Sequence, residues 1–185
     1  MRKRLVILSI FISWLFASAQ ASPAQKTASP KDVSDFRKAC RRLAHKASLM
    51  SVMGLDGWLL MDNELEHLAA GEFWGKAARK TGRARRPAQR NPLPAILDAH
   101  KQFSALGIRL IVLPIPAKSI IYPDAVWSGA PRGPKGRFLR LDPDHQKFYA
   151  LLREKGVEVM DFTDLMLEQG REKEPALYCR HDTHY

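Results

Sequence analysis

The tightest cluster of chemically active side chains lies at positions 178–185, which read Tyr178-Cys179-Arg180-His181-Asp182-Thr183-His184-Tyr185. Asp182 stands close enough to His184 in the chain for its carboxylate to accept a hydrogen bond from one imidazole nitrogen. The other nitrogen is then free to take a proton from a nucleophile. Asp182 and His184 therefore supply two members of a hydrolase-type catalytic triad, and the nucleophile is the missing member.

The same segment also allows a metal site made of His181, Asp182 and His184. Ligands this close together in sequence lack the distant ligand and the supporting hydrogen bonds that most protein metal sites have. We therefore disfavour a metal, predict no cofactor, and interpret His181 as an exposed neighbour of the acid–base pair.

Cys40 and Cys179 are the two cysteines of the chain. In an oxidising compartment such a pair is most simply a disulfide, which typically stabilises a fold by about 2–4 kcal/mol. We predict this disulfide, with two free buried thiols as the alternative.

The amino terminus has the anatomy of a secretory signal. Met1–Arg4 is basic, Leu5–Ala17 is apolar, and Ala19–Ala21 offers a cleavage site between small residues. The apolar run is shorter than the roughly 20 residues that a membrane-spanning helix needs. We predict a signal peptide at residues 1–21 and a periplasmic protein, which is anchored to the inner membrane only if the signal is not cleaved.

The formal net charge of the chain is +11, and removal of the three basic residues in the predicted signal leaves +8. Export argues against nucleic acid as the partner, so an acidic polysaccharide or an anionic lipid surface remains. Residues 76–90, the basic segment, contain no acidic residue, and they form either a solubilising insertion or a landing surface for a polyanion. Its candidate polyanion contacts are Lys76, Arg79, Lys80, Arg83, Arg85, Arg86 and Arg90.

Residues 22–33 have the composition of a linker, and residues 34–185 form one predicted domain. Apolar spacing predicts helices at 34–47, 64–70, 92–106, 143–155 and 163–169, and strands at 57–61, 108–113 and 157–161. The order helix, glycine, buried strand occurs twice, which favours an α/β three-layer sandwich with a mostly parallel sheet. Lys118, Ser119 and Tyr122 follow the strand at 108–113, where sites form in such sheets.

Five motifs, taken together and in this order, resemble the alginate O-acetyltransferase family, the AlgX and AlgJ type of SGNH-hydrolase-like proteins. The motifs are Gly54–Leu60, Gly71–Gly75, Pro92–Leu97, Leu113–Asp124 and Tyr178–Tyr185. The resemblance implies an exported enzyme that acetylates hydroxyls of a secreted, alginate-like polysaccharide alongside other exopolysaccharide assembly proteins. It also implies that Asp182 orients His184 and that His184 is the general base.

The sequence departs from this family at the nucleophile. The family places its serine downstream of the Asp-His pair, whereas no Gly-Asp-Ser or Gly-x-Ser-x-Gly turn occurs in residues 1–185. We therefore expect an incomplete domain, truncated at the carboxyl end, that has little turnover by itself. The alternative is a non-catalytic periplasmic protein that binds or assembles polysaccharide. Trp58, Phe73 and Trp74 are candidates to stack on a sugar, although aromatic residues in such segments more often belong to the core.

Overall fold

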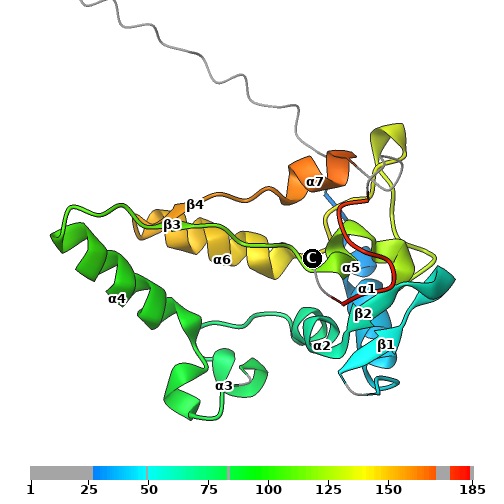
Figure 1. Cartoon of the computed structure of the whole chain (residues 1–185), viewed down its shortest axis with the longest axis horizontal. Coiled ribbons are helices and arrows are strands. Elements are labelled where there is room, and N and C mark those ends of the chain that lie inside the picture. Colours follow the sequence, from blue (N-terminus) through cyan, green and yellow to red (C-terminus); the bar gives the residue numbers. More distant parts are fainter. Residues whose placement is uncertain (1–26, 49, 83, 170–175, 184–185) are drawn as a thin grey trace, which may run out of the picture.

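The computed structural model describes residues 27–48, 50–82, 84–169 and 176–183 (Figure 1). Its α-helices are α1 (Pro30–Ala44), α2 (Asp62–Ala70), α3 (Ala78–Thr81), α4 (Pro92–Ala105), α5 (Lys118–Ile121), α6 (Pro143–Glu154) and α7 (Thr163–Gln169). Its strands are β1 (Ser51–Met53), β2 (Leu59–Met61), β3 (Ile111–Val112) and β4 (Glu158–Val159). Short 3-10 turns are η1 (Leu55–Gly57), η2 (Pro87–Gln89), η3 (Pro123–Ala125) and η4 (Pro134–Gly136).

Helix α1 begins earlier than its apolar spacing predicts. The side chain of Ser29 caps the helix by accepting from the Asp32 amide, the Asp32 carboxylate accepts from the Ser29 amide, and Pro30 occupies the first turn. This reciprocal cap satisfies amides that the helix itself leaves unpaired. The predicted start at Ser34 was therefore wrong, because the Ser29 cap fixes an earlier first turn, in which Val33 is already buried.

A first hydrophobic core joins α1, α2 and the β1–β2 pair (Figure 1). Phe36 of α1 and Leu65 of α2 are fully buried, and β1 pairs with β2 in antiparallel register. Trp58 is also buried here, with its ring centroid 4.4 Å from that of Tyr122. A Cβ atom at Gly54 would lie 2.4 Å from the carbonyl oxygen of Ala125, so the turn between these strands requires glycine. Trp58 is thus a core residue.

A second core lies between α6, β4 and α4. Phe148 and Leu152 of α6 pack with Val157 and Val159, and Leu97 of α4 lies against them. Strands β3 and β4 are parallel, with Val112 paired to Val159. Helix, turn and parallel strand therefore occur here as the sequence predicts, and the mixed content of helices and strands is that of an α/β protein.

The predicted burial of residues 108–113 on both faces is wrong. Ile108, Ile111 and Leu113 are 51%, 37% and 54% exposed. Within the described residues, the strands form two sheets of two strands each, so β3 is paired with β4 alone. A continuous apolar run therefore marks a strand here, but it does not establish that a second layer covers it.

The predicted signal peptide lies outside the described residues, as do residues 22–26 of the predicted linker. Residues 30–33 of that linker belong to helix α1. Among the helices that the structure describes, none combines the length and apolar character needed to cross a membrane.

Candidate active site

Three segments that are distant in sequence meet around α5. The amide of Leu59 donates to the carbonyl oxygen of Arg180 at 2.9 Å, which joins β2 to residues 176–183, the carboxyl-terminal stretch. The Tyr178 hydroxyl donates to the carbonyl oxygen of Pro116, and the Leu177 amide donates to the Tyr122 hydroxyl at 3.1 Å. These bonds bring together three motifs that the sequence analysis identified separately.

Lys118 lies at the centre of this meeting point and is 2% exposed. Its Nζ atom donates to the carbonyl oxygens of Leu59 at 3.1 Å and Cys179 at 2.7 Å, and to that of Asp182. Burial lowers the pKa of Lys118, while the acidic groups of Cys179, Glu64 and Asp182 oppose that shift. An ammonium group has three donors, and here all three are directed at main-chain oxygens. We call this arrangement the Lys118 clamp.

The Lys118 clamp holds the stretch that carries Asp182, whose side chain is exposed. His181 is exposed as well. His184 lies outside the described residues, so the predicted hydrogen bond from His184 to Asp182 stays a prediction.

Ser119, the serine next to the clamp, does not face solvent. It is 1% exposed, and its Oγ atom has no hydrogen-bond partner among the described residues. A nucleophile must reach an incoming ester, so this position does not suit the missing member of the triad.

The predicted disulfide is not formed. Cys40 is a free thiol buried in the first core, whereas Cys179 is a free thiol exposed on the carboxyl-terminal stretch. Cys40 occupies the core-facing side of α1, and burial raises the pKa of its thiol to about 12. The sequence pattern failed here because cysteine is also a small apolar residue that fills helix-packing positions.

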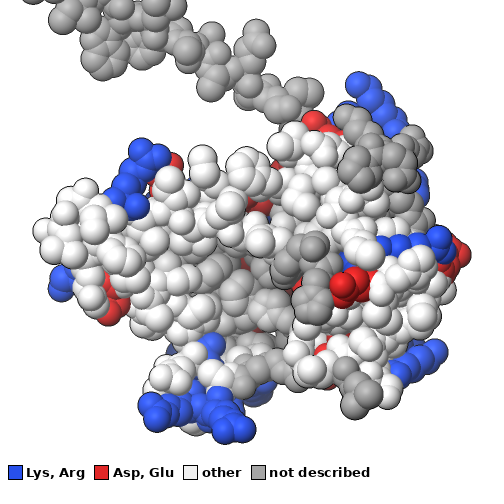
Figure 2. Space-filling view, in the orientation of Figure 1, with Lys and Arg blue, Asp and Glu red and all other residues white. Residues whose placement is uncertain are grey.

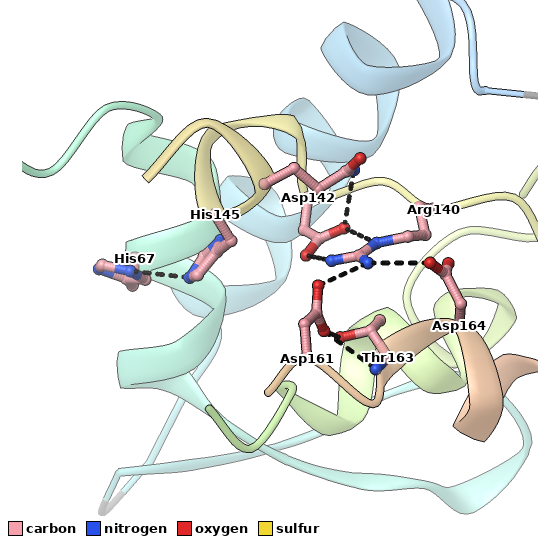
Figure 3. A network of polar contacts seen from close by, with 8 residues as sticks. His67, Arg140, Asp142, His145, Asp161, Thr163 and Asp164 are labelled. Carbon is pink, nitrogen blue, oxygen red and sulfur yellow. Dashed lines mark hydrogen bonds and ion pairs between the residues drawn. The ribbon is translucent and has the colours of Figure 1, made fainter. Parts of the chain in front are cut away.

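A cavity of about 250 Å³ lies beside the Lys118 clamp, between α2 and α6. Its polar lining consists of Asn63, Glu64, His67, Asp142, His145 and Tyr149. The Nε2 atoms of His67 and His145 are 3.2 Å apart, and Figure 3 shows the two rings directed at each other. Among the described residues, no group of three histidine, cysteine or acidic side chains is arranged to hold a metal ion.

Burial disfavours the charged form of both imidazoles. Burial lowers the pKa of His67 to about 4, with the nearby His145 as a second cause. Burial also lowers the pKa of His145, against the opposing effect of Asp142 and Asp144. One neutral ring therefore donates to the other, because each neutral imidazole has one donor and one acceptor.

Arg140 holds Asp142, one of the residues that line this cavity, in a network of ion pairs. Its guanidinium contacts Asp142 at 2.7 Å, Asp161 at 2.7 Å and Asp164 at 3.3 Å (Figure 3). Asp161 in turn accepts from the Thr163 hydroxyl at 2.6 Å. This network ties the start of α6 to the start of α7 and gives Asp142 a compensating positive charge.

The basic segment forms a projecting lobe around α3, where Lys and Arg side chains gather (Figure 2). Lys76, Arg79, Lys80, Arg85 and Arg86 are exposed. Arg90 is half-buried, and it donates to the carbonyl oxygens of Ala84 and Arg79. Arg83 lies outside the described residues. Arg90 therefore supports the lobe, and the exposed members form its charged surface.

Sequence reasoning singled out Lys118 but not its role, and it missed the cavity. His67 and His145 are separated by 78 positions, so no local spacing connects them. Arg140 likewise lies in none of the motifs that the sequence analysis identified. The sequence pointed to this region only through the Leu113–Asp124 motif, which contributes Ile115, Pro116, Ala117 and Ile120 to the cavity lining.

A family model described as "SGNH hydrolase-like domain, acetyltransferase AlgX" matches residues 51–185, which is most of the chain. No curated protein and no solved structure matches the chain.

Proposed function

Because the chain belongs to the family of SGNH hydrolase-like domains represented by the acetyltransferase AlgX, we propose that it is an exported O-acetyltransferase acting on hydroxyl groups of a secreted polysaccharide. The Lys118 clamp is the observation that supports this most, because it fixes the stretch carrying Asp182 against β2. A buried lysine whose donors are all used on main-chain oxygens positions a backbone segment and leaves the proton transfer to other groups.

In the proposed reaction, a serine hydroxyl attacks the carbonyl carbon of an acetyl ester. His184, oriented by Asp182, takes the serine proton and returns it to the departing alcohol, leaving an acetyl-serine. A sugar hydroxyl then attacks this ester and His184 takes its proton; as the bond to serine breaks and the sugar acetate forms, His184 returns the proton to the serine oxygen. Main-chain amides stabilise the oxyanion in both steps. The serine is not assigned to any residue of the sequence.

We further propose that β3, β4, α4 and α6 belong to a three-layer SGNH-hydrolase-like sandwich. The parallel β3–β4 pair and the helices packed on it support this architecture. The exposed apolar side chains of β3 are consistent with a sheet that has further layers or strands against it.

The basic segment favours a second role, binding of an acidic polysaccharide, which does not require turnover. Its exposed lysines and arginines project from α3 and the turn that follows it. Such a lobe attracts a polyanion at low ionic strength and loses that attraction as salt screens the charges. An assembly protein without catalysis needs this surface alone, whereas a transferase needs the Asp182–His184 pair as well.

Acetyl transfer by the protein purified from its source tests the proposal. The purified protein is incubated with a chromogenic acetyl ester and an exported polysaccharide, and polymer-bound acetyl groups are measured. We expect transfer that falls about 10³-fold or more in Asp182→Asn, because that change disturbs the orientation of the base. The matched variant His181→Ala, from the same exposed stretch, should keep its activity. Equal loss in both variants, or no loss in Asp182→Asn, would contradict the proposed pair.

A further inference from the structure

The cavity between α2 and α6 shares a wall with the candidate active site. Pro116 and Ala117 line the cavity. The carbonyl oxygen of Pro116 accepts from Tyr178, and the next residue after Ala117 is the clamp lysine. The cavity is therefore connected to the stretch that presents Asp182 through the residues that precede α5.

The charge of the cavity does not suit an acidic ligand. Of the described residues that line it, none is lysine or arginine, whereas Glu64 and Asp142 are both acidic. The guanidinium of Arg140, which pairs with the lining residue Asp142, already contacts three carboxylates. The Lys118 ammonium is directed at three carbonyl oxygens. A carboxylate bound here would lose its water without gaining a cation, which is strongly unfavourable.

The neutral groups of the cavity do suit hydroxyls. Burial keeps the His67 and His145 rings neutral, so the pair has both donors and acceptors to offer. Tyr149 lines the same cavity, and within the described residues its hydroxyl has no hydrogen-bond partner. Phe73 packs on both imidazoles, with ring centroids at 4.7 Å from His67 and 5.0 Å from His145, which fixes their orientation.

The size and the apolar wall complete the match to a sugar ring. A cavity of about 250 Å³ has room for one sugar ring. Ile115, Pro116 and Ala117 provide an apolar surface of the kind that packs on the C–H face of a sugar.

We propose that this cavity binds one uncharged sugar residue, so that the acceptor unit of the polysaccharide carries no carboxylate. The inference rests on the proposed function and narrows its acceptor, since an alginate-like polymer consists of acidic sugars. In this proposal, acidic units elsewhere on the polymer bind to the basic segment, which is a separate surface.

Direct binding tests this without any need for turnover. The protein is labelled with ¹⁵N-histidine and titrated with β-1,4-linked mannotriose or with the matched mannuronate trisaccharide, and imidazole signals are followed by NMR. We expect saturable shifts of His67 and His145 with mannotriose, at least about tenfold weaker binding of the mannuronate, and unchanged signals of exposed His45. Equal or tighter binding of the mannuronate at these histidines, or no shift with either sugar, would overturn the proposal.

Two variants sharpen the result. Tyr149→Phe removes one hydroxyl and should weaken mannotriose about tenfold or more. Asn63→Lys places a cation at the lining and should tighten mannuronate binding at least about fivefold, whereas Gln102→Lys on α4 should not. Unchanged mannuronate binding in Asn63→Lys would refute the charge argument. Because these readouts do not involve acetyl transfer, an inactive protein that still binds mannotriose would contradict the proposed function alone.

Discussion

The Nζ atom of Lys118 lies 2.7 Å from the carbonyl oxygen of Cys179, although 61 positions separate the two residues. The same atom also donates to Leu59 on β2 and to Asp182. One ammonium group therefore joins β2, α5 and the carboxyl-terminal stretch. The placement of Asp182 thus depends on a lysine whose donors are directed at main-chain oxygens.

Replacing Lys118 with methionine should free the carboxyl-terminal stretch. The substitution leaves three main-chain oxygens without their donor, and a buried unsatisfied polar group costs about 1–3 kcal/mol. We expect lower stability to urea and faster amide hydrogen exchange at Leu59 and in residues 177–183, with α1 and α2 changed much less. The exposed Lys101→Met provides the control. Unchanged exchange at Leu59 would mean that the clamp does not hold the stretch.

Arg140 should be the most sensitive charged residue outside the active site. Its side chain is 10% exposed, and Arg140→Met leaves Asp142 and Asp161 as buried charges without their partner. Breaking such a network typically costs about 3–5 kcal/mol. Arg109 contacts Glu158 at the surface, and Arg109→Met should cost about 0–1 kcal/mol. Chemical denaturation of both variants checks this, and similar losses in the two would contradict it.

The protein should lose stability in mild acid through His67. Burial lowers the pKa of His67 from its ordinary 6.5 to about 4. Between these values the unfolded chain binds more protons than the folded one, so the free energy of unfolding falls as the pH drops from 6.5 to about 4. Above 6.5 this group has little effect. Urea unfolding at several pH values should show a smaller fall in His67→Phe, and parallel curves for variant and wild type would contradict the assignment.

The basic segment should account for retention on acidic polymers. Replacing both Arg85 and Arg86 with serine removes two exposed charges, so the protein should elute from an immobilised polyuronate at lower salt. The matched double variant Lys101→Ser with Lys155→Ser removes the same charge from elsewhere on the surface. If both variants shift equally, net charge and not the lobe determines binding. Equal retention on neutral and acidic polymers would contradict the proposal that the basic segment binds acidic polymers through its charge.

Local signals predicted the helices and the order of elements well. Asn91 caps α4 through its side chain, and helices α6 and α7 begin and end within a residue or two of their predicted limits. Capping residues and apolar spacing act within a few positions, so they can be recognised in a single sequence. The start of α1 was missed because its reciprocal Ser29–Asp32 cap lies in a segment with the composition of a linker.

Contacts between residues that are distant in the chain were harder to predict from the sequence. The exposure of Ile111 and Leu113 depends on what packs against β3, and apolar character alone does not specify this. The facing of His67 and His145 results from the packing of α2 near α6 through Phe73. Lys118 was noticed for its place after a strand, but its partners are carbonyl oxygens, which every residue possesses and no motif encodes.

The proposed Asp182–His184 pair is tested in cells whose native gene carries Asp182→Asn, by measuring the acetyl-ester content of the exported polysaccharide. We predict that acetylation falls to the level of a gene deletion in Asp182→Asn and stays near normal in cells with His181→Ala. Normal acetylation in Asp182→Asn would contradict the proposed acid–base pair and leave binding or assembly of polysaccharide as the role of this protein.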